Sequence, residues 1–465
     1  VYTMPEFLER GYNPQSRTIL SVISLVSYVL TKVAVTVYAG GLVFQQVFGI
    51  KELWGIDFFW IAAIGLVVLT ALYTIFGGMK SVLYTSVLQT PILLLGSLII
   101  LVLGFKELGG WDEMMRVCGA VTVNDYGDTM TNLIRSNDDA NFPWLGALIG
   151  SAIIGFWYWC TDQFIVQRVL SGKNEMEARR GTIFGAYLKL LPVFLFLIPG
   201  MIAFALHQKY IGAGGEGFLP MLANGTANAD AAFPTLVAKL LPAGVKGLVV
   251  CGILAALMSS LASLFNSSAM LFTIDFYKRF RPETPEKKLV GIGQVATVVI
   301  VILGILWIPI MRSVGDVLYT YLQDVQSVLA PGIAAAFLLG ICWKRTSAQG
   351  GMWGLIAGMV IGLTRLGAKV YYSNAGEVAD STFKYLFYDM NWLFFCGWMF
   401  LFCIIVVIVV SLATKAPTAE KIQGLVFGTA TKEQKAATRA SWNHWDIIHT
   451  VIILAITGAF YWYFW

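Results

Sequence analysis

The sequence predicts an all-α protein that crosses a lipid bilayer many times. Hydrophobic residues make up 57% of its 465 residues, charged residues only 13%, and the mean hydropathy is +0.72. An ordinary soluble domain carries about 25% charged residues, so this chain has too little polar surface to cover a soluble body. The composition therefore excludes a cytosolic enzyme, a disordered scaffold and a nucleic-acid-binding protein.

Eleven apolar runs are long enough to cross a bilayer, because its core requires ~20 mostly apolar residues for each helix. Several runs are longer than that, which indicates tilted or bent helices. The last run ends in an aromatic cluster, 461–465, of the kind found at membrane interfaces. The predicted spans are 18–48, 56–78, 82–105, 144–170, 181–206, 243–276, 289–311, 316–343, 350–371, 390–413 and 445–465.

The basic residues predict the orientation, since cytoplasmic loops carry an excess of Lys and Arg. Nineteen of the 32 basic residues lie on one side, in the N-terminal segment and near residues 80, 171–180, 277–288, 344–348 and 414–443. We expect that side in the cytoplasm, with residue 1 inside and the C-terminus outside. The net charge of +5 is then mainly this cytoplasmic excess of basic residues, which sets the topology, and it does not indicate an acidic partner.

Polar groups inside a span are costly and tend to mark a transport pathway. The first span carries Tyr28, Thr31 and Lys32 about midway along it. Two interpretations of Lys32 stay open. In one, the span is tilted and Lys32 extends its ammonium to the interface. In the other, Lys32 faces the helix bundle beside a solute.

The fourth span contains an aromatic string, Phe156 to Cys160, that runs into Thr161, Asp162 and Gln163. Aromatic side chains at this density also pack as an ordinary core or interface. A flat apolar ring beside hydrogen-bonding groups is, however, what a sugar requires in a dry cavity. Asp162 needs a partner, and Arg168, six residues further on, is the candidate.

Lys189 lies eight residues into the fifth span, too deep for a simple interface anchor. A buried ammonium requires oxygen ligands, so we expect Lys189 to face the helix bundle. Pro192 follows three residues later and frees a backbone carbonyl near it.

The sixth span places Ser259, Ser263, Asn266 and Ser267 on one helical face. Small residues of this kind also let membrane helices pack closely, so packing remains an alternative to a binding site. A hard cation such as Na⁺ requires several oxygen ligands. Paired hydroxyls opposite an unwound helix form such ion sites in transporters.

The eighth span has three polar residues within four positions, Gln323, Asp324 and Gln326, ahead of Pro331 and Gly332. A Pro-Gly interruption exposes backbone groups, which is tolerated only against protein or a water-lined cavity. This pattern predicts a binding site near the midplane of the membrane.

Together these clusters resemble the sodium/solute symporter family, and within it the sodium/glucose and sodium/galactose cotransporters. The set of motifs is highly specific, although no single motif is. The resemblance runs from Tyr2 through at least residue 345. It is carried by Tyr2–Phe7, Thr31-Lys32, Ala71–Ile75 with Gly77-Gly78, Trp157–Gln163 with Gln167-Arg168, Leu188–Leu190, Ala255–Ser260, Phe272–Asp275, and Gln323 followed by Ala330-Pro331.

The resemblance implies a LeuT-like fold, an inverted repeat of five plus five core helices with added flanking helices. On this interpretation residues 1–345 form the transporter core, and their spans correspond to core helices three to ten. Residues 346–465 then form three peripheral transmembrane helices.

The resemblance also implies roles for residues that contact the sugar. Lys189 and Gln323 match ligands of sugar hydroxyls. Tyr158 resembles the aromatic residue that stacks on the sugar and gates it from the cytoplasm, and Trp159 is its neighbour. Tyr319 matches an aromatic residue of the outer gate.

Further matches concern the border of the sugar site and the ion. Tyr28 and Lys32 match positions that border the sugar. The carbonyl of Ala256 and the hydroxyls of Ser259 and Ser260 match the main sodium site, so Na⁺ is the implied co-transported ion.

Three departures from the family pattern matter. Core helices one and two would precede residue 1; they supply sugar and sodium ligands in the family, so we expect this chain to be a fragment. Ser86 stands where many members carry the Asp of a second sodium site, which favours one sodium per sugar. Gly155 stands where relatives offer Asn or Thr to the sugar, which leaves the identity of the sugar open.

The resulting hypothesis is sodium-driven symport of a glucose-like or galactose-like sugar by alternating access, in the plasma (cell inner) membrane. Its partners are then a sugar, Na⁺ and the lipid bilayer, with no nucleic acid. An enzyme is not expected, because no nucleophile–base pair is visible. Two alternatives stay open: symport of another polyol or an organic acid, which Lys32 and Lys189 would attract, and a sensor that binds sugar without moving it.

Overall fold

The structure is a computed structural model, and it forms two compact units that are described in turn. The described residues are 3–222, 225–314, 317–375 and 379–464, with the side chains of 73, 75–82, 85, 88 and 312–314 outside the description. The first unit comprises residues 1–34, 137–183 and 267–450. The second unit comprises residues 35–136, 184–266 and 451–465.

The prediction of an all-α polytopic membrane protein is confirmed. Within the described part of the chain, ten helices are long and apolar enough to cross a membrane, and each matches a predicted span. The remaining predicted span, 56–78, corresponds to a shorter apolar stretch, Phe58–Leu72. The ten are Pro14–Phe48, Gln89–Leu108, Trp144–Thr161, Glu175–Gly212, Ala243–Phe280, Glu286–Met311, Leu318–Cys342, Ala348–Asn374, Trp392–Ala413 and His444–Tyr463.

One predicted break between spans is absent. The predicted spans 56–78 and 82–105 are joined in a single helix, α4 (Phe58–Leu108), so the loop expected near residue 80 is helical. The segment between the two spans contains no proline, and glycine weakens a helix without ending it. At 1.5 Å per residue α4 is ~75 Å long, which is more than twice the ~30 Å thickness of a bilayer core.

Local capping signals explain why the first helices begin where they do. The side chain of Thr3 accepts a hydrogen bond from the backbone N–H of Glu6 and begins α1 (Met4–Gly11). The side chain of Asn13 accepts from the N–H of Ser16 at 2.8 Å and begins α2 (Pro14–Ser27). Each helix has proline in its first turn, where a missing N–H has no helical partner to lose.

The first unit has a core of buried apolar residues that includes Leu20, Ile153, Trp157, Phe337 and Trp392. Its further helical elements are η1 (Tyr28–Val33), α6 (Trp144–Phe156), η2 (Trp157–Thr161), α7 (Gln163–Leu170), the start of α8 (Glu175–Pro192), η5 (Leu271–Tyr277), α12 (Lys278–Phe280), α13 (Glu286–Val314), α14 (Leu318–Cys342), α15 (Ala348–Asn374), α16 (Thr382–Lys384), η6 (Tyr385–Asp389), α17 (Trp392–Ala413), α18 (Ala419–Ile422) and α19 (Lys432–Ala440).

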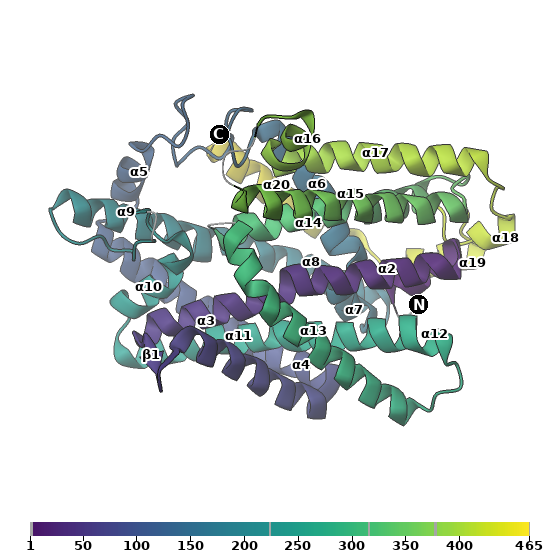
Figure 1. The fold of residues 1–465 in the computed structure, drawn as a ribbon, viewed down its shortest axis with the longest axis horizontal. Coiled ribbons are helices and arrows are strands. Elements are labelled where there is room, and N and C mark those ends of the chain that lie inside the picture. The colour runs from purple at the N-terminus through teal and green to yellow at the C-terminus, as the bar shows by residue number, and fades with distance from the viewer. Residues whose placement is uncertain (1–2, 223–224, 315–316, 376–378, 465) are drawn as a thin grey trace. The chain divides into compact units, whose positions relative to one another are not determined.

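Helices α14, α15 and α17 lie side by side in the first unit, and α6 packs against α14 and α17 (Figure 1). Glycines on α15 make this packing close. A Cβ atom on Gly358 would lie 2.6 Å from the Cα atom of Gly332 on α14, and one on Gly362 would meet the carbonyl of Val328. Small residues allow this backbone-to-backbone approach between membrane helices.

Tyr12, in the turn between α1 and α2, is a buried anchor for α14. Its hydroxyl donates a hydrogen bond to the carbonyl of Ala336 at 2.6 Å, and its ring lies against Gly340 and Gly351. Burial raises the pKa of this phenol well above its ordinary value, so the hydroxyl stays protonated and remains a donor.

The second unit has its own apolar core, which includes Ile100, Met114, Ile202, Leu206 and Val237. Its elements, besides α4 and the rest of α8, are α3 (Ala34–Phe48), β1 (Glu52–Leu53), β2 (Ile56–Asp57), α5 (Trp111–Gly119), η3 (Val193–Leu197), α9 (Ile198–Gly212), η4 (Ala229–Ala231), α10 (Ala232–Leu240), α11 (Ala243–Met270) up to Asn266, and α20 (His444–Tyr463) from Val451.

A short hairpin is the one sheet in the described residues. Strands β1 and β2 pair antiparallel, with Glu52 opposite Asp57 and Leu53 opposite Ile56. Trp54 and Gly55 between them both have positive φ, at 55° and 75°. Two consecutive residues of this conformation form the tight turn whose twist matches a hairpin.

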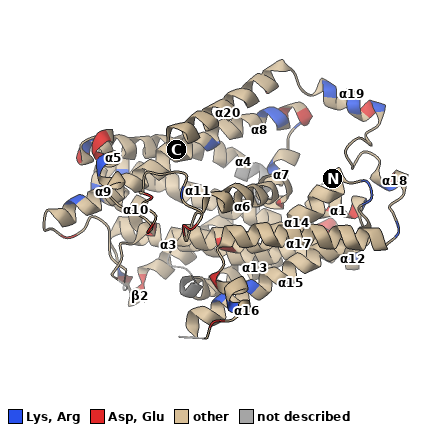
Figure 2. Cartoon of the chain, turned by 90° about the horizontal axis from the view of Figure 1, so that it is seen from above, with Lys and Arg blue, Asp and Glu red and all other residues tan. Residues whose placement is uncertain are grey.

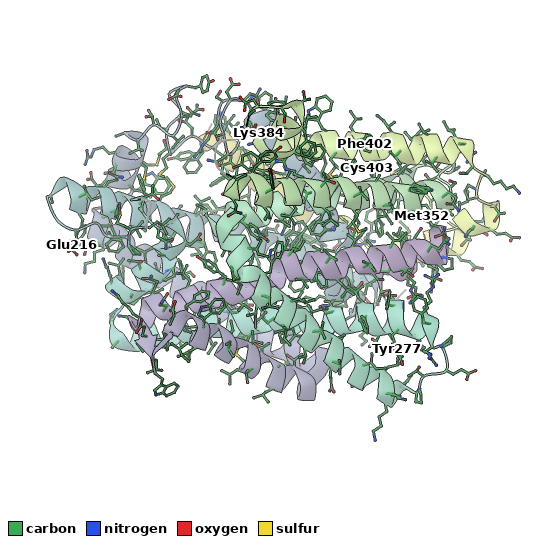
Figure 3. The ribbon with its side chains drawn as sticks, viewed as in Figure 1. Glu216, Tyr277, Met352, Lys384, Phe402 and Cys403 are labelled. Carbon is green, nitrogen blue, oxygen red and sulfur yellow. The ribbon has the colours of Figure 1, made fainter. Side chains whose placement is uncertain are left out.

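The helix shafts of each unit are almost free of charge, and charged residues collect at helix ends and in connecting segments such as α18 and α19 (Figure 2). On α17, Cys403 is buried while its neighbour Phe402 is 46% exposed (Figure 3). Apolar side chains exposed along such a shaft are expected where a helix faces lipid.

Candidate functional site

The aromatic string of the first unit lies where one helix ends and another begins. After α6 the backbone passes through the π-helical turn η2, and Asp162 then adopts an extended conformation (φ −79°, ψ 121°) as the N-cap of α7. The Asp162 carboxylate accepts a hydrogen bond from the N–H of Phe164 at 3.1 Å. The break therefore places an acidic side chain next to the string, and π-helical turns of this kind occur frequently at functional sites.

Asp162 binds residues of the first span. The Lys32 ammonium forms an ion pair with Asp162 Oδ2, and the Tyr28 hydroxyl donates to Oδ1 at 3.0 Å. Lys32, Asp162 and Tyr28 are 8%, 4% and 0% exposed. Lys32 therefore faces the interior of its unit, and the alternative in which it extends to the interface is wrong. The partner of Asp162 is Lys32 rather than the expected Arg168.

Aromatic rings surround the Lys32 ammonium. The distance from its Nζ atom to the ring centroid is 4.3 Å for Phe164, 4.7 Å for Tyr28 and 5.3 Å for Tyr158. Such rings stabilise a cation electrostatically. Because Asp162 and these rings already compensate its charge, Lys32 has little remaining attraction for an anionic solute.

Tyr158 and Trp159 occupy different positions in the string. Tyr158 is half-buried, with its ring tilted against Trp157 and edge-on to Trp159 at a centroid distance of 5.2 Å. Trp159 is 49% exposed. The string therefore presents both an inward-facing ring and an accessible one.

Gln323 and Tyr319 lie on adjacent turns of α14. The Gln323 amide donates to the Tyr319 hydroxyl at 2.8 Å, and Tyr319 is 56% exposed. The predicted interruption at Pro331-Gly332 is absent, because α14 is continuous from Leu318 to Cys342. Pro331 removes one backbone hydrogen bond, while close packing against α15 through Gly332 holds the helix together.

The predicted sodium residues of the second unit lie on α11. Ala256, Ser259 and Ser260 span about one turn of this helix. Ser259 is 8% exposed. Its hydroxyl lies 2.6 Å from the hydroxyl of Ser86 on α4, and its carbonyl accepts from Ser263 at 3.0 Å. Ser86 is therefore in direct contact with a predicted ion ligand.

Lys189 lies on α8 in the second unit, one turn before Pro192 and the π-helical turn η3. It is exposed rather than buried, which differs from the sequence expectation of a buried ammonium.

Sequence reasoning did not predict the charged partners of two buried carboxylates of the first unit. Asp275 is fully buried and accepts from Thr3 Oγ1 at 2.9 Å and from Arg17 Nε at 2.7 Å. Asp324 pairs with Lys369 and approaches Arg365. The signal was available, because Arg365 lies deep within a predicted span.

Comparisons with known proteins agree with the resemblance. The profile of the sodium:solute symporter family matches residues 1–358. A sodium/mannose cotransporter of Bos taurus is 35% identical over the whole chain and 80% of its own length. The sodium/myo-inositol cotransporter 2 of Homo sapiens is 35% identical over 92% of the chain, and the sodium/glucose cotransporter 1 of Ovis aries is 37% identical over 89%. The chain spans 64% of the length of each of these last two.

A solved structure shares the fold. The substrate-bound, outward-open structure of a Na⁺-coupled sialic acid symporter superimposes with a TM-score of 0.65. The matched region covers 90% of this chain and 78% of the symporter chain, at 21% sequence identity. The likeness confirms the predicted LeuT-like transporter fold.

Proposed function

The chain belongs to the sodium:solute symporter family, and from that premise we propose that it couples uptake of a sugar or sugar-like polyol to inward movement of Na⁺. The family consists of sodium-coupled transporters, so the predictions of symport, of Na⁺ as the co-transported ion and of a protein that is not an enzyme are confirmed. The observation that carries the sugar class is the 35–37% identity to cotransporters named for mannose, myo-inositol and glucose.

For the solute, we propose Gln323 and Lys189 as ligands of hydroxyl groups and Tyr158 as the stacking residue and inner gate. The Gln323–Tyr319 contact supports this, since an amide and a phenol at 2.8 Å both donate and accept hydrogen bonds as sugar hydroxyls do. Tyr319 then acts at the outer gate, and Trp159 adds an apolar surface beside Tyr158.

We propose that Tyr28 and Lys32 border the solute beside the aromatic string. The buried Tyr28 hydroxyl and Lys32 ammonium are both bound to Asp162, which suits residues that hold the string in place. The same pairing counts against an organic-acid solute, because the Lys32 charge is already neutralised.

For the ion, we propose the carbonyl of Ala256 and the hydroxyls of Ser259 and Ser260 on α11. Oxygen ligands on one helix are suited to Na⁺. The contact between Ser259 and the neutral Ser86 supports one sodium per sugar, since a hydroxyl stands at position 86 in place of the carboxylate that would hold a second cation. Bound sodium and bound solute then favour each other, because coupling between two sites is reciprocal.

We propose further that residues 1–345 form the transporter core and 346–465 three peripheral helices. The protein is a multi-pass membrane protein, and we propose that it lies in the plasma membrane. The uneven distribution of basic residues supports an orientation with residue 1 in the cytoplasm and the C-terminus outside. Val1 and Trp465 themselves lie outside the described residues.

Uptake into proteoliposomes tests the proposal. The protein expressed from its complete gene is reconstituted and given radiolabelled glucose, mannose or myo-inositol, with an inward gradient of either Na⁺ or K⁺. We expect accumulation that requires Na⁺, and a lower apparent affinity for the sugar in Gln323→Ala. Binding of labelled sugar without accumulation would identify a sensor instead. Equal uptake with the two cations would refute sodium coupling.

A further inference from the structure

A buried charged cluster connects α14 to α15 directly beside Gln323. Asp324 is 7% exposed and Arg365 is 0% exposed. The Lys369 ammonium binds Asp324 Oδ2, and Arg365 Nη2 lies 3.8 Å from Oδ1. One negative and two positive charges share this site, and breaking such a buried pair costs much more than breaking one at the surface.

Arg365 is itself held by neighbouring backbone. It donates to the carbonyl of Leu386 at 3.3 Å and to that of Met390 at 2.6 Å. Its guanidinium lies over the ring of Phe395, 4.0 Å from the centroid. The cation that faces Asp324 is therefore fixed by the η6 segment and by the start of α17.

The glycine contacts described above fix the same two helices further along. Gly358 packs against Gly332, and Gly362 against the carbonyl of Val328, which lies one helical turn after Asp324. Between these positions Pro331 lacks the N–H that would bond to the carbonyl of Ser327. Side-chain contacts to α15 therefore replace part of the restraint that an unbroken helix would supply.

Because Asp324 and Gln323 lie on the same helix, holding Asp324 against α15 also fixes the direction in which Gln323 points. Adjacent residues are ~100° apart around a helix, so Asp324 faces α15 while Gln323 lies on another face with Tyr319. A side chain reaches ~5–6 Å from the helix axis, so a rotation of ~10° moves the amide by ~1 Å. Displacements of that size are large for a binding contact.

We propose that Lys369 and Arg365 are positioning residues that hold Asp324 and thereby orient Gln323 toward the transported solute. This inference rests on the proposed function, which assigns Gln323 to the solute. Buried ion pairs seldom add net stability over apolar side chains of similar size, which favours a role in placing the helix over a role in stabilising it.

The test compares Lys369→Met with Lys384→Met in sodium-driven sugar uptake by the reconstituted protein. Lys384, labelled in Figure 3, makes an ion pair with Asp380, which is solvent-exposed. It is the matched control because it loses the same charge. We expect Lys369→Met to raise the KM for sugar by about tenfold, with maximal rate and sodium half-saturation within about twofold, and Lys369→Arg to restore most of the affinity. Lys384→Met should match the wild type. An unchanged KM in Lys369→Met overturns the inference.

The double variant Asp324→Asn/Lys369→Met covers the case in which Lys369→Met fails to fold, since it leaves no unpaired carboxylate. We expect its KM to be raised by no more than that of Asp324→Asn alone, because the two residues act as a pair. A normal KM, or a KM raised well beyond that of Asp324→Asn alone, overturns the inference. Failure of wild-type uptake would instead refute the proposed function, so the two failures are distinguishable.

Discussion

At Asp162 three donors meet one carboxylate: the Lys32 ammonium, the Tyr28 hydroxyl and the N–H of Phe164. Removing one charge of a buried pair leaves the other unpaired, at a cost of about 3–5 kcal/mol. We expect Lys32→Met to lower the unfolding temperature of the detergent-solubilised protein strongly, measured by fluorescence-detected size exclusion. Lys32→Met combined with Asp162→Asn should recover much of the loss. A single variant as stable as the wild type would contradict the buried pairing.

Ser86 allows a prediction about the number of sodium ions. Its hydroxyl touches that of Ser259 at 2.6 Å, so Ser86→Asp would place a carboxylate beside a proposed ion ligand. Carboxylate oxygens suit hard cations. We expect the Hill coefficient for sodium activation of uptake to rise from ~1 toward ~2, measured by varying Na⁺ at saturating sugar. Ser86→Asn is the neutral control and should keep the lower value; an equal rise there would remove the carboxylate explanation.

At the scale of elements, the contact between α14 and α15 predicts which glycines can be replaced. A Cβ atom on Gly358 would lie 2.6 Å from backbone of α14, whereas one on Gly367 meets nothing within 4 Å. We expect Gly358→Ala to destabilise the protein by about 1–3 kcal/mol through overpacking. Gly367→Ala should be neutral or slightly stabilising, because alanine favours helix. Thermal unfolding of the two variants side by side decides whether the helices are packed as described.

The elements were largely predictable because membrane spans are recorded in continuous apolar runs. The boundary near residue 80 was not predictable, because glycine signals neither a helix nor a loop, and the structure continues α4 through it. Pro331 misled in the opposite direction: the sequence shows the lost hydrogen bond but not the close approach of Gly358 that supports α14. The presence of such support depends on residues distant in sequence.

The candidate site was also predictable in part: single residues could be identified from the sequence, but their partners could not. Unusual polar residues within spans identified Lys32, Asp162 and Gln323, since each conflicts with its apolar surroundings. Their partners were not predictable, as the assignment of Asp162 to Arg168 shows. Lys32 lies 130 positions from Asp162, and Lys369 lies 45 from Asp324. Only the fold brings such pairs together.

At the scale of the whole molecule, symport is a thermodynamic property that no single residue reports. With equal Na⁺ on both sides of a proteoliposome membrane, only the membrane potential can drive accumulation of a neutral sugar. One charge moving through 100 mV supplies about 2.3 kcal/mol, which corresponds to a roughly 50-fold concentration ratio, because about 1.4 kcal/mol is tenfold. Two sodium ions per sugar would give a ratio of about 2,400-fold. A potassium diffusion potential set with valinomycin provides the 100 mV.

We expect the steady-state concentration ratio of labelled sugar, extrapolated to zero leak, to approach the roughly 50-fold limit for one sodium ion. The reason is that Ser86 places a hydroxyl beside Ser259, where a second sodium ion would need a carboxylate. Leak only lowers the ratio, so a value well above 50-fold would show that more than one charge moves with each sugar and would contradict one-sodium coupling. Ser86→Asp, measured in the same vesicles, should exceed the wild-type ratio if its added carboxylate carries a second ion through the cycle. An unchanged ratio beside a raised Hill coefficient would mean that the second ion binds without being transported.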